Sequence, residues 1–146
     1  MTQLLYETDF SKWALTQADA LRNEEYADLD RQNLIEEIED MARSERKELH
    51  NVFVKIIEHL LKLECEPNSQ AVNHWKREVQ TWRIQLRHML KSNASLKAHA
   101  QDYVEEAYQD ALIIAATGAD CSIEDFPAYC RWTADHLLDL TFWPNH

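Results

Sequence analysis

The sequence predicts an all-α fold: a bundle of four main helices, one of them unusually long, with a short C-terminal helical segment packed across it. Only one glycine and three prolines occur in 146 residues, whereas strands joined by tight turns need both residue types. Apolar residues also recur at spacings of three and four over long stretches, which is the helical period. The length is that of one domain, so we expect a single helical domain over residues 1–146.

The first expected helix begins near the N-terminus. Thr8 or Asp9 can cap it, and it runs to about Arg22. Its apolar side is formed by Phe10, Trp13, Leu15, Ala18 and Leu21. The polar stretch NEEYADLD then forms a short connection.

The longest expected helix runs from about Asp30 to Cys65, a stretch without glycine or proline. Its residues at spacings of three and four form a mostly apolar stripe: Leu34, Ile38, Met41, Glu45, Leu49, Val52, Ile56, His59 and Leu63. The pattern allows one helix of about 35 residues or two helices broken near Ser44. Pro67 ends it in either case.

Two further long helices follow, from about Ala71 to Lys91 and from about Leu96 to Thr117, with Gly118 as the C-terminal stop of the second. In the remaining tail, residues 122–125 have a capping-box pattern, and Thr133 can cap a last short helix through Leu140. Five aromatic residues lie in this tail, and we expect some to cover the core and others to face a partner: Phe126, Tyr129, Trp132, Phe142 and Trp143.

The formal net charge is −11, and its sign varies along the chain. Residues 24–48 carry −6, residues 74–97 carry +5 and residues 98–146 carry −8. An acidic protein repels nucleic acid at long range, although the central basic segment allows a local patch. The plainer interpretation is that the basic helix packs against the acidic ones.

The chain has no apolar run near the roughly 20 residues that span a bilayer, and its N-terminus lacks a basic segment followed by an apolar one. We therefore expect a cytoplasmic protein without membrane contact. Cys65, Cys121 and Cys130 are odd in number and lack metal-ligand spacing, so we expect three reduced thiols.

Several motifs, in order and at characteristic spacing, are similar to a known family. They are YETDFSKWALTQADALR near the start, LDRQNLIEEIEDMARSERKEL in the middle, EHLLKLECEP after it and TFWP near the end. The chain thus resembles the bacterial proteins grouped as domain of unknown function 29 over nearly its whole length. The resemblance implies an all-α bundle and no accepted activity or catalytic residues.

Acidic side chains interrupt the stripe of the longest helix. Glu37, Glu45 and Glu48 fall in the same sector as its apolar residues, and buried carboxylates need partners. They are candidate metal ligands of a helical bundle, but the Glu-x-x-His pairs of such sites do not occur. The alternative, which we favour, is that they pair with Arg83, Arg87 or Lys91.

Two features are candidates for nucleic-acid chemistry. Lys76, Arg83, Arg87 and Lys91 project from one side of the basic helix beside tryptophans, a combination that single-stranded nucleic acid uses. Separately, Arg43 and His50 are a candidate catalytic pair like the Arg and His of the HEPN ribonucleases, because a spacing of seven returns to the same helix face. The plainer explanation, which we favour, is that the tryptophans belong to the core, the arginines bridge to an acidic helix, and Arg43 and His50 lie on a solvated face.

The function that the sequence favours is a small protein-interaction or regulatory module without a cofactor, acting through a protein partner or as a homo-oligomer. There is no phosphate-binding loop and no nucleophile with a matching base. The alternatives are a metal-independent HEPN-like ribonuclease or RNA-binding protein, and a carboxylate-bridged metal-binding bundle.

Overall fold

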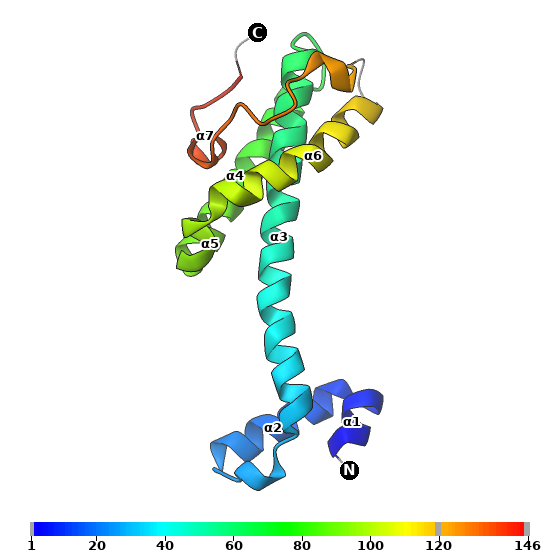
Figure 1. Cartoon of the computed structure of the whole chain (residues 1–146), viewed down its shortest axis with the longest axis vertical. Helices are drawn as coiled ribbons and strands as arrows, with labels where there is room; N and C mark the ends of the chain where they lie inside the picture. Colours follow the sequence, from blue (N-terminus) through cyan, green and yellow to red (C-terminus); the bar gives the residue numbers. More distant parts are fainter. Residues whose placement is uncertain (1, 119–120, 145–146) are drawn as a thin grey trace. The chain divides into compact units, whose positions relative to one another are not determined.

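The computed structural model describes residues 2–118 and 121–144, with side chains from Leu4 onward. Its elements are α1 (Thr2–Thr8), α2 (Phe10–Arg22), the 3-10 turn η1 (Tyr26–Asp28), α3 (Arg31–Cys65), α4 (Val72–Ser92), α5 (Ala94–Ala98), α6 (Ala100–Gly118), the 3-10 turn η2 (Ile123–Asp125) and α7 (Ala134–Leu138). These elements are drawn in Figure 1. The described residues contain four long helices and no strand, which confirms the predicted all-α class.

The chain divides into two compact units, residues 1–45 and 46–146, and α3 contributes to both. Of the two alternatives that the sequence allowed, the structure has the single helix, since α3 continues through Ser44. Folding as one domain stays a prediction.

In the first unit, the Asp9 side chain caps α2 as predicted, accepting a hydrogen bond from the Lys12 amide at 3.1 Å. The preceding helix α1 was not predicted. Tyr6, Phe10 and Trp13 form a ring cluster with centroids 4.8–5.9 Å apart. Because Trp13 is 2% exposed, this cluster is the small core of the unit.

The core of the second unit is centred on the C-terminal part of α3, against which α4 and α6 lie (Figure 1). Along α3, buried residues occur on more than one side of the helix: Leu49, Val52, Phe53, Ile56, Ile57, Leu60, Leu61 and Leu63. A helix apolar over so wide a sector needs neighbours on several sides. The predicted fourth helix is split at His99, whose backbone leaves the helical conformation, into α5 and α6.

The C-terminal segment follows the predicted caps closely. Ser122 and Asp125 form the capping box of η2, and Thr133 caps α7, which ends at Leu138 rather than Leu140. Four of the five tail aromatics pack on the core, namely Phe126, Trp132, Phe142 and Trp143. Tyr129 is 66% exposed.

Candidate functional site

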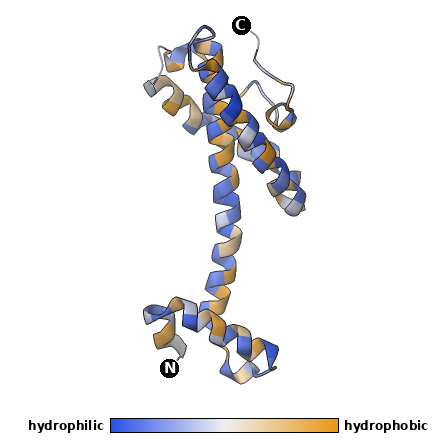
Figure 2. Cartoon of the chain, turned by 180° about the vertical axis from the view of Figure 1, so that it is seen from behind, coloured by the Kyte–Doolittle hydropathy of each residue, from blue (hydrophilic) through white to orange (hydrophobic). Residues whose placement is uncertain are grey.

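The N-terminal part of α3 carries an apolar face that the rest of the first unit leaves open. Ile35, Ile38 and Met41 are 49%, 63% and 68% exposed. Figure 2 shows apolar residues recurring between hydrophilic ones along this part of the helix. Further along α3 the same periodicity is buried, with Leu49 at 0% and Val52 at 2%. One stripe is therefore core in the second unit and surface in the first.

The helices of the first unit contact α3 on a different side. The Tyr6 hydroxyl donates to Glu37, and Trp13 Nε1 donates to Asp30 at 3.0 Å. At 100° per residue, Glu37 and Asp30 lie about 80–100° round the helix from Ile38. The contacts therefore leave the Ile38 face uncovered.

The first unit is acidic and rich in exposed apolar side chains. It holds twelve acidic and four basic residues, a formal charge of −8. Among the described side chains, eight of the thirteen large hydrophobic ones that are exposed belong to it: Leu4, Phe10, Leu15, Leu21, Tyr26, Ile35, Ile38 and Met41. Of these, Ile35, Ile38 and Met41 lie on one side of α3. Exposed apolar patches mark interaction surfaces, so this unit is the candidate site.

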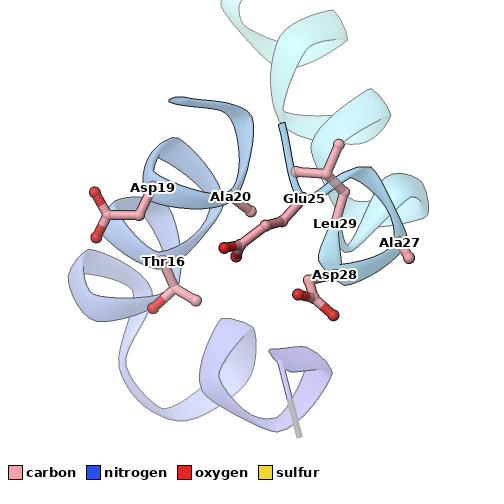
Figure 3. Close-up of a pocket in the computed structure, with 7 residues that line it drawn as sticks. All are labelled: Thr16, Asp19, Ala20, Glu25, Ala27, Asp28 and Leu29. Carbon is pink, nitrogen blue, oxygen red and sulfur yellow. The ribbon is translucent and has the colours of Figure 1, made fainter. Parts of the chain in front are cut away.

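A pocket of about 560 Å³ lies between α2 and the η1 segment. In Figure 3 the Thr16, Glu25 and Asp28 side chains turn toward the opening, whereas the Asp19 carboxylate points away and pairs with Arg22. Ala20, Ala27 and Leu29 complete the lining. Because Glu25 and Asp28 turn toward its opening, the pocket is a negatively charged hollow.

The predicted catalytic pair lies on either side of the boundary between the units. In the first, the Arg43 guanidinium pairs with Asp40 and, at 3.6 Å, with Glu39. The Asp40 hydrogen bond raises the pKa of Arg43 further. In the second, His50 Nε2 lies 2.8 Å from Asp110 Oδ2 on α6, beside Val54, Ile113 and Ile114. The carboxylate orients the imidazole, and a catalytic role of either residue stays a prediction.

Arg83, one of the predicted cations of α4, binds the C-terminal segment. Arg83 is fully buried, so the prediction that it faces nucleic acid is wrong. It donates to the Leu137 carbonyl oxygen at 2.9 Å and to that of Phe142 at 2.8 Å, with a longer bond of 3.4 Å to that of His136. Desolvation lowers its pKa to about 10, partly opposed by Asp139.

The other cations of this helix differ in their surroundings. Arg87 donates from an exposed position to the Leu138 carbonyl oxygen at 2.9 and 3.1 Å. Lys76 lies 5.2 Å from the centroid of the Trp143 ring. Lys91 lines a small pocket with Leu90 and Arg87. The four residues therefore do not form one exposed basic surface.

Two of the three predicted carboxylates, Glu37 and Glu48, have partners other than Arg83, Arg87 or Lys91. Glu37 accepts from Tyr6, and Glu48 accepts from Gln85 Nε2 at 3.0 Å. Over the described ranges, no group of three or more His, Cys, Asp or Glu side chains could hold a metal ion. Glu37, Glu45 and Glu48 therefore do not converge. The expected pairing of Glu48 with an arginine is wrong because a glutamine faces it.

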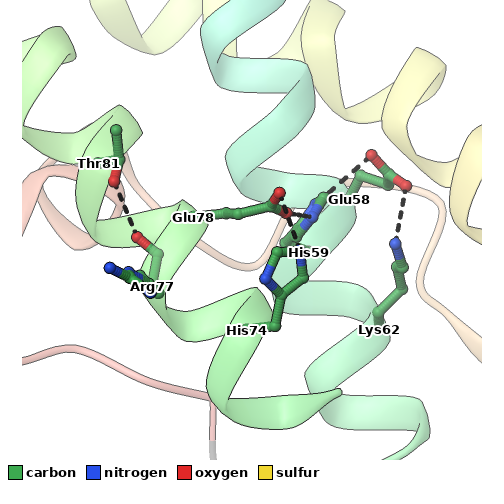
Figure 4. Close-up of polar contacts among 7 residues, drawn as sticks. All are labelled: Glu58, His59, Lys62, His74, Arg77, Glu78 and Thr81. Atoms are coloured by element: carbon green, nitrogen blue, oxygen red, sulfur yellow. Dashed lines mark hydrogen bonds and ion pairs between the residues drawn. The ribbon is translucent and has the colours of Figure 1, made fainter.

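A cluster that the sequence analysis did not assemble joins α3 and α4 in the second unit. Glu78 bridges two imidazoles, with its Oε2 2.6 Å from His59 Nε2 and its Oε1 3.2 Å from His74 Nε2 (Figure 4). His59 is 7% exposed. Its Nδ1 lies 3.5 Å from a carboxylate oxygen of Glu58.

The surroundings of this cluster fix the His59 ring. Contact with His59, together with Lys62, lowers the pKa of Glu58 against the opposing effect of burial. The ring also meets Trp82 edge to face at 4.7 Å. The sequence signal was a histidine inside an apolar stripe, but its partner Glu78 is 19 residues away. The cluster connects α3 to α4.

The cysteines differ from the expectation of three reduced thiols. Cys65 at the end of α3 and Cys121 before η2 form a disulfide with Cα atoms 6.1 Å apart, so that expectation is wrong for this pair. Sequence spacing could not reveal it because 56 residues separate the two. Cys130 is a free thiol, and burial raises its pKa to about 11.

Fold and site together define an all-α protein with an open apolar helix face. The model of the family described as "Domain of unknown function DUF29" matches residues 5–143, and the chain belongs to this family. The resemblance seen in the sequence motifs is thereby confirmed.

One solved structure is similar over most of its length. It is the crystal structure, at 1.45 Å resolution, of an α-helical protein of unknown function from Rhodospirillum rubrum. The two are 28% identical with a TM-score of 0.50, and the match covers 94% of this chain and 90% of that one. Comparison with curated proteins gives no match. In the described residues, no helix has the length and apolarity needed to cross a membrane.

Proposed function

We propose that this chain is a protein-interaction module that binds an amphipathic helix of a protein partner along the open face of α3. The observation that carries this is the exposure of Ile35, Ile38 and Met41 on one side of one helix. Full burial of such a side chain contributes about 1.5–3 kcal/mol. Anchors at helical spacing are the usual means by which one helix recognises another.

The residues around this face support the same function. Arg31 and Glu45 are exposed toward the two ends of this face, and Glu39 is exposed about 100° round the helix from Ile38. An apolar centre with a charged rim is the common composition of a protein interface, in which the centre supplies affinity and the rim supplies selectivity. The proposal needs no cofactor.

Photo-cross-linking in cells that produce this protein tests the proposed function. A benzophenone amino acid replaces Ile38, and the matched control replaces Ile84, which is 51% exposed on α4. We expect one discrete polypeptide to cross-link at position 38 but not at 84, with Met41→Glu removing the product. Mass spectrometry identifies the polypeptide and the attached peptide. Equal cross-linking at both positions, or none at 38, would refute the proposal.

A further inference from the structure

The open face of α3 is chemically symmetric about Ile38. At 100° per residue, positions 31, 34, 35, 41, 42 and 45 all lie within about 60° of Ile38 round the helix. They are Arg31, Leu34, Ile35, Met41, Ala42 and Glu45. Residues the same number of positions before and after Ile38 are both apolar: Leu34 and Ala42 are four positions away, and Ile35 and Met41 are three. The outermost pair, Arg31 and Glu45, is oppositely charged.

This symmetry points to a second copy of the chain as the partner. We infer that two copies pair through this face with their α3 helices antiparallel and a two-fold axis at Ile38. The inference rests on the proposed function and names its partner. In a two-fold contact each residue i of one copy meets residue j of the other, and j meets i. Ile35 would then pack on Met41 of the other copy twice, once on each side of the axis.

The charges at the two ends select the antiparallel direction. Arg31 and Glu45 lie about 21 Å apart along one helix at 1.5 Å per residue, too far to interact within the chain. In the antiparallel pair they face each other twice. A parallel pair would instead place Arg31 on Arg31 and Glu45 on Glu45, which is repulsive.

Overall charge makes this pairing weak and salt-dependent. Each chain carries −11, so two copies repel at long range. Salt screens this repulsion, since the Debye length falls from about 30 Å at 0.01 M to about 8 Å at 0.15 M. A partner with a basic surface would show the opposite salt dependence. The area that one helix face can bury in a dimer is small for a protein interface. We therefore expect a dissociation constant on the order of micromolar.

Sedimentation equilibrium of the purified full chain tests the pairing. Between about 1 and 200 µM we expect a monomer–dimer equilibrium that tightens as NaCl rises from about 0.02 to 0.3 M. Ile38→Glu, which places two carboxylates at the axis, should weaken the dimer at least about tenfold. The matched control Ile84→Glu should leave it unchanged, and circular dichroism shows whether both variants retain their helix content.

The register is tested by charge exchange. Arg31→Glu and Glu45→Arg should each weaken the dimer, and the double variant should restore it, because residues 31 and 45 meet only between copies. If the double variant dimerises no more tightly than the weaker-binding single variant, the antiparallel register is overturned.

A chain that stays monomeric at every concentration and salt, or a dimer that Ile38→Glu leaves intact, would overturn the self-pairing. Neither result decides the proposed function, which depends on the cross-link at position 38. A cross-linked peptide from another protein would keep that function and refute the second copy as partner.

Discussion

The buried guanidinium of Arg83 should hold the C-terminal segment onto α4. Its side chain is 0% exposed and donates to the carbonyl oxygens of Leu137, Phe142 and His136. It also lies 4.7 Å from the centroid of the Trp143 ring. Replacing it by methionine keeps an apolar chain of similar length and removes all of these hydrogen bonds. We expect Arg83→Met to loosen the segment selectively.

The magnitude follows from two opposing contributions. Arg83 makes four hydrogen bonds, because its Nη1 also donates to Gln80 Oε1 at 3.2 Å. A hydrogen bond from a charged donor contributes about 1.5–3 kcal/mol, so these four, two of them long, contribute about 6 kcal/mol. The fall in the pKa of Arg83 from 12.5 to about 10 corresponds to a burial cost of about 3 kcal/mol. Arg83→Met removes both, and we expect a net loss of about 3 kcal/mol.

Arg87 supplies the matched control. It donates to the single carbonyl oxygen of Leu138 from an exposed position, where water can replace it, so Arg87→Met should cost about 1 kcal/mol or less. Urea unfolding measures the free energy of both variants, and amide hydrogen exchange over residues 134–142 locates the loss. Equal effects of the two substitutions, or exchange unchanged in this segment, would refute the role assigned to Arg83.

Two further predictions concern ionisable groups. The hydrogen bond to Glu37, with some burial, raises the pKa of Tyr6 to about 12, above its unfolded value near 10; its stabilising effect is thus complete below pH 10 and lost as pH rises toward 12. In Glu37→Gln, ultraviolet titration should lose the tyrosine step near pH 12, and persistence of that step would contradict the assignment. Burial raises the pKa of the Cys130 thiol to about 11, so iodoacetamide at pH 8 should modify it slowly in the native chain and quickly in urea; equal rates would show that the thiol is accessible.

Sequence patterns predicted the helices where the deciding interaction is local. The Asp9 and Thr133 caps bond to amides within three residues, and α6 includes Gly118, one residue beyond the predicted end at Thr117. The break at His99 and the helix α1 were not predicted. No local pattern marks α1, because Tyr6 on this helix is held by tertiary contacts with Phe10, Trp13 and Glu37.

Side-chain partners were predicted less well because they depend on distant elements. Charge runs correctly marked α4 as the basic helix, yet Arg83 donates to backbone carbonyl oxygens, which sequence composition does not display. Glu78 joins His59 across 19 residues, and Cys65 joins Cys121 across 56. Opposite charge alone therefore named the wrong partners for Arg83, and sequence spacing named none for His59 or Cys65.

The apolar stripe of α3 also shows that a sequence pattern does not identify the partner of a helix face. Its spacing is identical before and after Glu45, yet Ile38 is 63% exposed whereas Leu49 is 0% exposed. Periodicity reports only that a helix has an apolar side; whether that side meets its own chain or another depends on how many elements are near it. In the second unit α4 and α6 cover the stripe. In the first, α1 and α2 bond to the neighbouring flank, so the uncovered half keeps the composition of a core while remaining free to pair with another helix.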